Sequence, residues 1–119
     1  MWGMASQLDE ATIKGLAQFY ASQTPQPSKP EDPQLVAAGS KIFSEGISAK
    51  GVPACATCHG KDGQGVAVYP RLAGQHVAYQ IKQLEAFRSG LRANPIMQPI
   101  AAKLSDAEMR AVATYTRSK

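Results

Sequence analysis

The 119-residue sequence predicts an all-α fold. Four segments repeat apolar residues at the three- and four-residue spacing of an amphipathic helix, and no segment shows the strict alternation of a half-buried strand. A short motif, Cys55-Ala56-Thr57-Cys58-His59, lies between the second and third of these segments. We therefore expect the helices to pack around this motif.

The first predicted helix lies within residues 1–23, with Asp9 as its N-cap. Its apolar face is formed by Ile13, Leu16, Ala17 and Tyr20. Residues 25–33 contain four of the eight prolines of the chain. Because proline removes an amide donor and disfavours helix at the preceding residue, this stretch predicts an extended linker.

Three further helices are predicted after the linker, at residues 34–45, 75–89 and 105–117. Within the first of them, Gly39 either allows another helix to cross closely or is a tolerated surface glycine. The last begins with the capping box Ser105-Asp106-Ala107-Glu108. We expect residues 91–100, which include two prolines, to form a loop.

The Cys55–His59 motif has the form C-x-x-C-H, the attachment sequence of a c-type haem. Two thiols add to the haem vinyl groups, and the adjacent imidazole becomes an iron ligand. The spacing suits this chemistry because one tight turn presents both sulfur atoms to the same edge of a flat macrocycle. The glycines at 60, 63 and 65 then either let the backbone run close to such a cofactor or form simple turns.

Three other interpretations of this motif fit the sequence less well than haem attachment. A thioredoxin-like redox site would require a βαβ context, which the sequence lacks. A Cys2His2 zinc site could use Cys55, Cys58 and either His59 or His76, but neighbouring Cys58 and His59 would crowd one tetrahedral ion. A structural disulfide across two residues would be strained and would close almost no loop. Haem attachment is therefore the favoured interpretation, with one haem c bound through Cys55 and Cys58.

Composition and charge limit the class of protein. Hydrophobic residues make up 44% of the chain and charged residues 18%, which is typical of one soluble globular domain. The formal net charge is +4. This balance suggests acidic partners, but the basic residues are scattered, so binding to nucleic acid is not expected. No stretch approaches the roughly 20 apolar residues of a transmembrane helix.

The expected compartment follows from the haem motif. Covalent attachment of haem takes place outside the cytoplasmic membrane in bacteria, and the chain has no cysteine beyond the pair in the motif. No signal peptide is visible at Met1. We therefore expect a periplasmic protein, in mature or truncated form.

An internal repeat is visible at an offset of 96 residues. Residues 1–9 align with residues 97–105, and the match continues through Ile13 with Met109 and Leu16 with Val112. Residues 1–24 therefore resemble the tail of a second copy of the domain. Chance similarity between two amphipathic helices is the alternative, but the proline-rich linker that follows argues against it.

Three stretches carry a family pattern, namely Cys55–Gly60, Tyr69–Leu84 and Met97–Asp106. On these residues the chain resembles the class I cytochromes c, and among them the two-domain, two-haem cytochrome c4 family. The resemblance implies a class I cytochrome c fold at residues 34–119, with helices wrapped around one covalently attached haem. The chain departs from the family pattern in having only one haem motif, because residues 1–24 resemble only the tail of a preceding cytochrome domain.

The resemblance also implies a set of site residues. His59 would be the proximal and Met97 the distal iron ligand. The carbonyl group of Pro70 would accept a hydrogen bond from the proximal imidazole. Arg71 would either pair with a haem propionate or be an ordinary surface residue. The sequence itself favours Met97, because flanking prolines can hold its backbone. Of the other methionines, Met109 lies inside a helix and is expected in the core, while Met1 and Met4 lie across the linker.

Filled axial positions predict an electron carrier rather than an enzyme. Its donor would be a quinol-oxidising complex or a dehydrogenase, and its acceptor an oxidase or a reductase. The alternative is a haem sensor or peroxidase-like enzyme with an open sixth iron position, but no distal base is evident. We also expect the apolar face of the helix in residues 1–24 to pack on its own haem domain or to form a homodimer.

Overall fold

The computed structural model describes residues 1–24 and 32–119. Its helices are α1 (Trp2–Ala5), α2 (Glu10–Ser22), α3 (Pro33–Glu45), α4 (Ala56–His59), α5 (Val77–Ser89), α6 (Met97–Ala101) and α7 (Asp106–Arg117), and η1 (Ser48–Lys50) is a 3₁₀ turn. In these two ranges no strand forms beyond two isolated bridges, Ile47–Val52 and Val66–Tyr69. The predicted all-α fold is confirmed. Most of the predicted linker, residues 25–31, lies outside the described residues.

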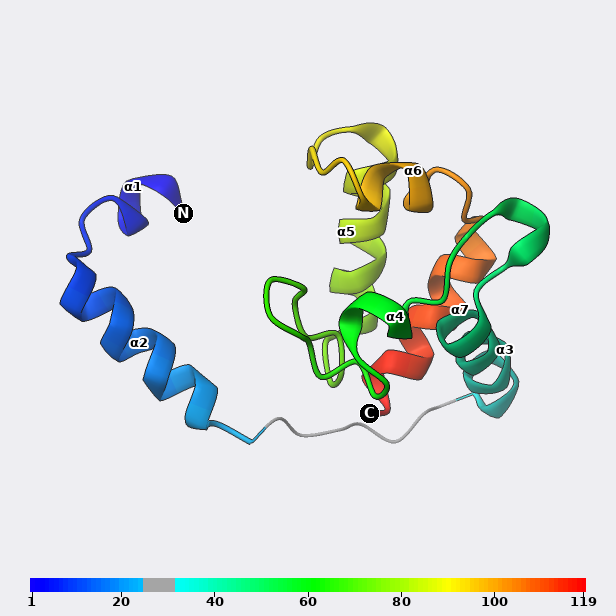
Figure 1. The fold of residues 1–119 in the computed structure, drawn as a ribbon, viewed down its shortest axis with the longest axis horizontal. Coiled ribbons are helices and arrows are strands. Elements are labelled where there is room, and N and C mark those ends of the chain that lie inside the picture. The colour runs from blue at the N-terminus through cyan, green and yellow to red at the C-terminus, as the bar shows by residue number, and fades with distance from the viewer. Residues whose placement is uncertain (25–31) are drawn as a thin grey trace.

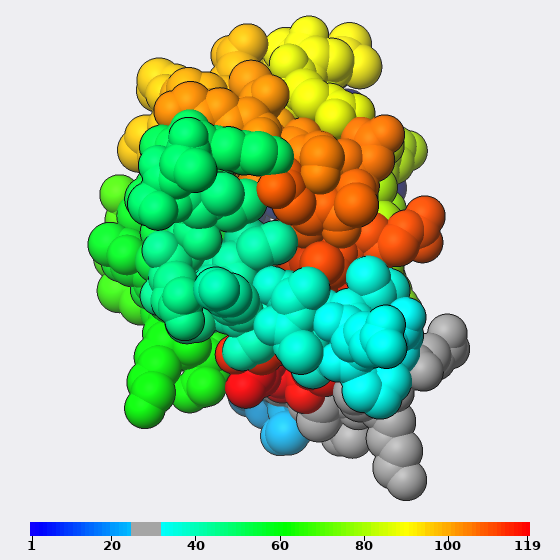
Figure 2. All heavy atoms as spheres, turned by 90° about the vertical axis from the view of Figure 1, so that its right-hand side faces the viewer, coloured from blue at the N-terminus to red at the C-terminus, as the bar shows by residue number. Residues whose placement is uncertain are grey.

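The domain is built on the crossing of α3 and α7, which pack side by side (Figures 1 and 2). Gly39 lies at the crossing, where an added Cβ atom would overlap the carbonyl group of Ala111 and lie 2.8 Å from Cβ of Tyr115. Of the two alternatives for Gly39, the structure therefore supports the close helix crossing. A glycine is needed because the two backbones approach closely enough to exclude even a methyl group.

Two apolar clusters form the core of the domain. Phe43, Val112 and Tyr115 form the first, and the rings of Phe43 and Tyr115 lie 5.3 Å apart between centroids. The second contains Val52, Leu104 and Met109. Met109 is fully buried, as the sequence predicted. Leu84 of α5 contacts both clusters and thereby joins α5 to the α3–α7 pair.

Helix ends follow the local sequence signals. The Ser105 hydroxyl accepts a hydrogen bond from the Glu108 amide, and the Glu108 carboxylate accepts one from the Ser105 amide, which confirms the capping box. Helix α3 begins one residue earlier than expected, at Pro33, because proline is well suited to the first helical position. Gly90 ends α5 in a left-handed conformation.

The predicted loop at residues 91–100 is partly wrong, because Met97 begins the short helix α6. The Asn94 carboxamide oxygen accepts hydrogen bonds from the amides of Ile96 and Met97, at 3.0 and 2.8 Å, and so satisfies two donors at the helix start. Pro99 lies in the first turn, where a helix needs no amide donor.

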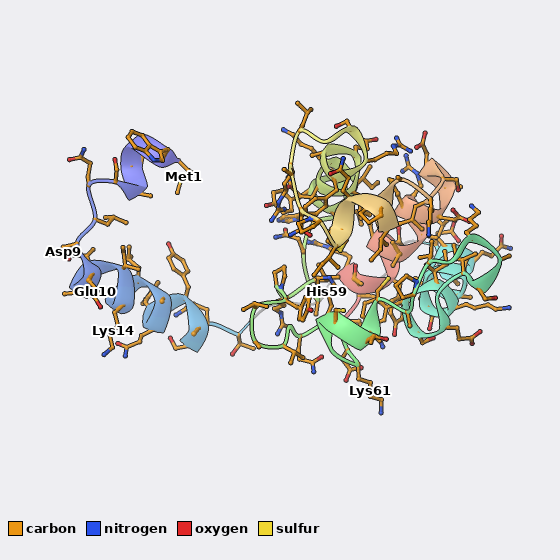
Figure 3. All side chains as sticks on the ribbon, turned by 45° about the horizontal axis from the view of Figure 1, so that its top comes forward. Met1, Asp9, Glu10, Lys14, His59 and Lys61 are labelled. Carbon is orange, nitrogen blue, oxygen red and sulfur yellow. The ribbon has the colours of Figure 1, made fainter. Side chains whose placement is uncertain are left out.

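Helices α1 and α2 have the same spacing as α6 and α7. Their N-caps, Asp9 and Ser105, are 96 residues apart, and each side chain accepts a hydrogen bond from the amide three residues later. All residues from 1 to 24 are exposed. Helices α1 and α2 lie apart from the other helices (Figures 1 and 3). The expectation that this segment packs on the haem domain is not met, since Phe19 remains 58% exposed. Among the described residues, none of the helices has the length and apolarity needed to cross a membrane.

Candidate functional site

The motif predicted to hold the cofactor forms the single-turn helix α4. Cys55 is its N-cap, and the Cys55 carbonyl accepts hydrogen bonds from the amides of Cys58 and His59, at 3.2 and 3.0 Å. Gly60 then ends the turn with a φ of +84°. This compact turn brings both thiols and the imidazole to one place. Both cysteines are half-buried.

His59 is the best-defined side chain of the site. It is 6% exposed, and its Nδ1 lies 2.8 Å from the carbonyl oxygen of Pro70. A carbonyl can only accept, so Nδ1 carries the proton and donates, which leaves the lone pair of Nε2 available to bind a metal. The Tyr69 ring meets the imidazole edge-on, at 6.2 Å between centroids. In Figure 3, His59 points into the domain, whereas Lys61 points away from it.

The loop after α4 holds the Pro70 carbonyl in place. The Gly63 carbonyl accepts hydrogen bonds from the amides of Leu72 and Ala73, at 2.7 and 2.9 Å, and the Gly65 amide donates to His59 O at 2.9 Å. The chain reverses between these contacts. The orientation of the imidazole is therefore set by backbone that lies 11 residues further along the chain.

Cys55 lies in an apolar environment suited to a large flat cofactor. Its side chain packs against the cluster formed by Phe43, Val112 and Tyr115. Burial raises the pKa of the Cys55 thiol to about 11, because the thiolate would lose its hydration there. Before haem attachment, Cys55 is therefore a neutral thiol beside apolar groups. This environment fits attachment to the hydrophobic edge of a haem.

The other predicted residues lie as follows. Met97 is partly buried at the start of α6, with its amide held by Asn94. Arg71 is exposed, and its Nε donates to the Ala73 carbonyl oxygen at 3.0 Å. With Gly74, Gln75 and His76 it lines a shallow hollow.

Sequence reasoning missed three features of the site region. Asn94 was not identified as the cap that holds Met97, although an Asn-Pro pair is a known turn signal. The ring contact of Tyr69 with His59 was also missed. Arg117 donates to Nδ1 of His76 at 2.8 Å, and this pairing joins residues too far apart in the chain for any local signal to indicate.

The rival interpretations of the motif receive no support from the geometry. Over residues 1–24 and 32–119, no group of three or more His, Cys, Asp or Glu side chains is arranged to hold a metal ion. Cys55 and Cys58 do not form a disulfide. The βαβ unit that a thioredoxin-like site requires is likewise not found in the described ranges.

Comparisons with known proteins agree with this geometry. A sequence model of the family described as cytochrome c matches residues 36–119. The chain therefore belongs to the cytochrome c family. It is 43% identical over 121 residues to cytochrome c4 of Azotobacter vinelandii, covering 97% of this chain and 57% of that protein. The structure of cytochrome c4 from Acidithiobacillus ferrooxidans superposes with a TM-score of 0.90 at 41% identity, covering all of this chain and 71% of that one.

A third relative matches a shorter part of the chain at higher identity. Over 77 residues the chain is 58% identical to a thiosulfate dehydrogenase electron acceptor of Stutzerimonas stutzeri, covering 63% of this chain and 36% of that protein. The chain spans about half the length of the curated relatives that it matches over nearly its whole length. Cys55 and Cys58 attach one c-type haem, and these relatives support an electron-transfer role for the chain.

Proposed function

We propose that this protein is a periplasmic carrier of single electrons, in which His59 and Met97 would bind the iron of the haem. The observation that carries the proposal is the 2.8 Å hydrogen bond from His59 Nδ1 to Pro70 O, which leaves Nε2 as the only ring nitrogen able to bind iron. Bound haem supplies the one-electron ferric–ferrous couple. The protein supplies the ligands, the apolar environment and a rigid frame.

Each ligand is held by a contact that does not depend on iron. His59 is oriented by Pro70 and is almost fully buried. The Met97 amide is held by Asn94, so the backbone at the start of α6 is constrained before any bond to iron forms. Preorganised ligands favour electron transfer because little has to move when the iron changes charge. Methionine as the sixth ligand also raises the reduction potential.

Arg71 would place its guanidinium near a haem propionate. Its Nε already donates to Ala73 O, which anchors the side chain, while the residue as a whole remains exposed. A guanidinium suits a carboxylate because it offers several donors in a planar array. This role would partly offset the charge of a propionate at the surface.

The proposed donor is a dehydrogenase of the kind served by the Stutzerimonas stutzeri relative. Support comes from the 58% identity over 77 residues, which is higher than the identity to the cytochromes c4. A quinol-oxidising complex is the other donor class, and an oxidase or a reductase would accept the electron. One electron passes in each encounter, and no bond to substrate forms or breaks in this chain.

The domain organisation belongs to the same proposal. Residues 1–24 would be the tail of a preceding cytochrome-like unit, residues 25–33 a linker, and residues 34–119 the cytochrome c domain. The equal spacing of the α1–α2 and α6–α7 pairs supports this division. The apolar face of α2 is the proposed site of association with a second copy of the chain.

A matched pair of methionine variants tests the ligand assignment. Met97→Leu should remove the weak far-red absorption band of a methionine–ferric iron bond, whereas Met109→Leu, in the buried core, should retain it. A pyridine haemochrome on each sample should report one haem c per chain. If the native protein lacks the band and binds added cyanide or carbon monoxide rapidly at neutral pH, the sixth position is open and a sensor or peroxidase-like role replaces the proposed one.

A further inference from the structure

The loop between α4 and α5 ends in an exposed apolar tip. Val66 and Tyr69 pair through two backbone hydrogen bonds, of 3.1 and 2.9 Å, and close a two-residue turn at Ala67 and Val68. The Val68 side chain is 88% exposed and that of Val66 is 50% exposed. We call residues 65–71 the valine hairpin (Figure 1, loop between α4 and α5).

The valine hairpin is held rigidly at its base. Gly65 has a φ of +85°, and a Cβ atom there would lie 2.8 Å from the Arg71 amide nitrogen, so its two ends are in close contact. Ala67, at the tip, has a φ of +51° and is the only residue other than glycine with a positive φ in the part of the chain that the structure describes. Backbone strain of this kind persists only where the surrounding structure enforces it, and it is common at functional sites.

A short path joins the tip to the iron ligand. Val68 is separated from Pro70 by one residue, and the Pro70 carbonyl accepts the 2.8 Å hydrogen bond from His59. The base of the hairpin is also tied to the motif helix, because the Gly65 amide donates to His59 O. A protein bound at Val68 would therefore contact the same backbone segment that orients the proximal imidazole.

The domain that carries the hairpin is basic. Across residues 32–119 the chain carries 11 Lys and Arg against 6 Asp and Glu. Close to the hairpin in sequence, Lys61 and Asp62 are both exposed and offset each other. The positive charge of the whole domain attracts an acidic protein, and the exposed valines offer that protein an apolar contact.

From these observations we propose that the valine hairpin is the docking surface for the electron donor, an acidic redox protein that contacts Val68 and delivers its electron on the side of the proximal ligand His59. This proposal rests on the proposed function and names the surface through which it acts. In the step, one electron leaves the reduced cofactor of the donor and converts ferric to ferrous iron here, with no proton or group transferred.

Two matched substitutions test the docking surface. Val68→Glu and Leu91→Glu introduce the same charge at side chains that are each 88% exposed, but Leu91 lies on the loop before α6. Ferric holoprotein is mixed with thiosulfate dehydrogenase of Stutzerimonas stutzeri and excess thiosulfate, and haem reduction is followed by stopped-flow absorbance. Val68→Glu should lower the second-order rate constant at least about tenfold and Leu91→Glu by less than about twofold.

Further measurements separate docking from damage to the haem site. Both variants should keep the native visible spectrum and the native rate of reduction by dithionite. The neutral substitution Val68→Thr should slow enzymatic reduction by about threefold, and added salt should slow reduction of the native protein because opposite charges attract.

The outcomes are distinct. A rate loss confined to the Val68 variants supports the docking surface. Equal rates for Val68→Glu and native protein, or equal losses for Val68→Glu and Leu91→Glu, would overturn it while leaving the proposed function intact. A native protein that the dehydrogenase cannot reduce would refute the proposed donor, and the docking proposal would fall with it.

Discussion

Gly15 and Gly39 each lie in the interior of a 13-residue helix, but their surroundings differ. Nothing lies within 4 Å of a Cβ atom built at Gly15, whereas one at Gly39 would overlap the backbone of Ala111. The same substitution should therefore have opposite effects at the two positions.

We expect Gly39→Ala to lower the free energy of unfolding of the haem domain by about 2–3 kcal/mol, because α3 and α7 would have to separate. Gly15→Ala should instead stabilise α2 locally by about 0.5–1 kcal/mol, since alanine is the better helix former in open space. Guanidinium titration followed by haem absorbance measures the first effect, and amide hydrogen exchange in α2 measures the second. A Gly39→Ala variant as stable as the native protein would contradict the close crossing.

The ion pair between Lys50 and Glu108 is a second single-residue feature, with a nitrogen–oxygen distance of 2.7 Å. Burial would by itself raise the pKa of Glu108, but hydrogen bonds from Lys50 and Ser105 outweigh it, and the pKa lies below its ordinary value of 4.5. A carboxyl group with a lowered pKa in the folded protein stabilises it above the ordinary pKa. This stabilisation is lost as the pH falls through the folded-state pKa.

Lys50→Gln should therefore destabilise the protein at pH 7 by about 0.5–1 kcal/mol, and the difference from native should vanish well below pH 4.5. Arg88→Gln provides the control, because its partner Asp106 is 81% exposed and the pair should contribute less. Urea titrations at several pH values measure both variants. If Lys50→Gln remained less stable than the native protein by the same amount at low pH, Glu108 would not be the relevant partner of Lys50.

At the scale of elements, the valine hairpin combines a strained tip with a tightly held base. Ala67 adopts a positive φ that glycine tolerates freely and a β-branched residue strongly disfavours. Ala67→Gly should change the free energy of unfolding by no more than about 1 kcal/mol, mainly because glycine relieves the backbone strain. Ala67→Val should lower the free energy of unfolding by about 1–3 kcal/mol. Thermal unfolding compares the two, and equal stability would show that residue 67 is not held in this conformation.

The short helix that carries Met97 is stabilised by its surroundings. Helix α6 has only five residues and would not form alone in water. The Asn94 side chain caps it, and α6 packs against α5. This arrangement places the proposed ligand on a supported turn instead of a free loop, which is the preorganisation that an electron carrier requires.

At the scale of the whole molecule, residues 1–24 form a separate amphipathic unit. The exposed fractions are 51% for Ile13, 41% for Leu16 and 69% for Tyr20, so the apolar face of α2 is open. An open face of this kind favours association. We expect the protein to form a dimer through α2 at micromolar concentrations, and expect a chain lacking residues 1–24 to be monomeric with an unchanged visible spectrum.

Two substitutions on α2 sharpen this test. Leu16→Lys places a charge on the apolar face and should abolish the dimer, whereas Gln18→Lys lies off that face and should leave it intact. Sedimentation velocity measures both. A native protein that remains monomeric at about 100 μM, or equal behaviour of the two variants, would refute association through α2.

Features of the fold and of the site could be predicted where they depend on contacts between residues that are close together in the sequence. The capping box at Ser105 and the turn at Cys55–His59 depend on contacts within five residues, and the sequence predicted both. The role of Gly39 was left open between two alternatives, because a glycine that permits a crossing and one that is merely tolerated look alike without the crossing helix. Helix α6 was predicted as a loop because its cap and its packing against α5 leave no periodic pattern.

The sequence by itself determined the chemistry of this protein: an all-α chain with one C-x-x-C-H motif, and hence one covalently attached haem. The fold class and the haem motif both follow from patterns among residues that are close together in the sequence. Only the tertiary structure decided that Ala111 passes over Gly39 and that Arg117 meets His76. These contacts depend on the path of the chain, since they join residues whose separation in sequence carries no information about their separation in space.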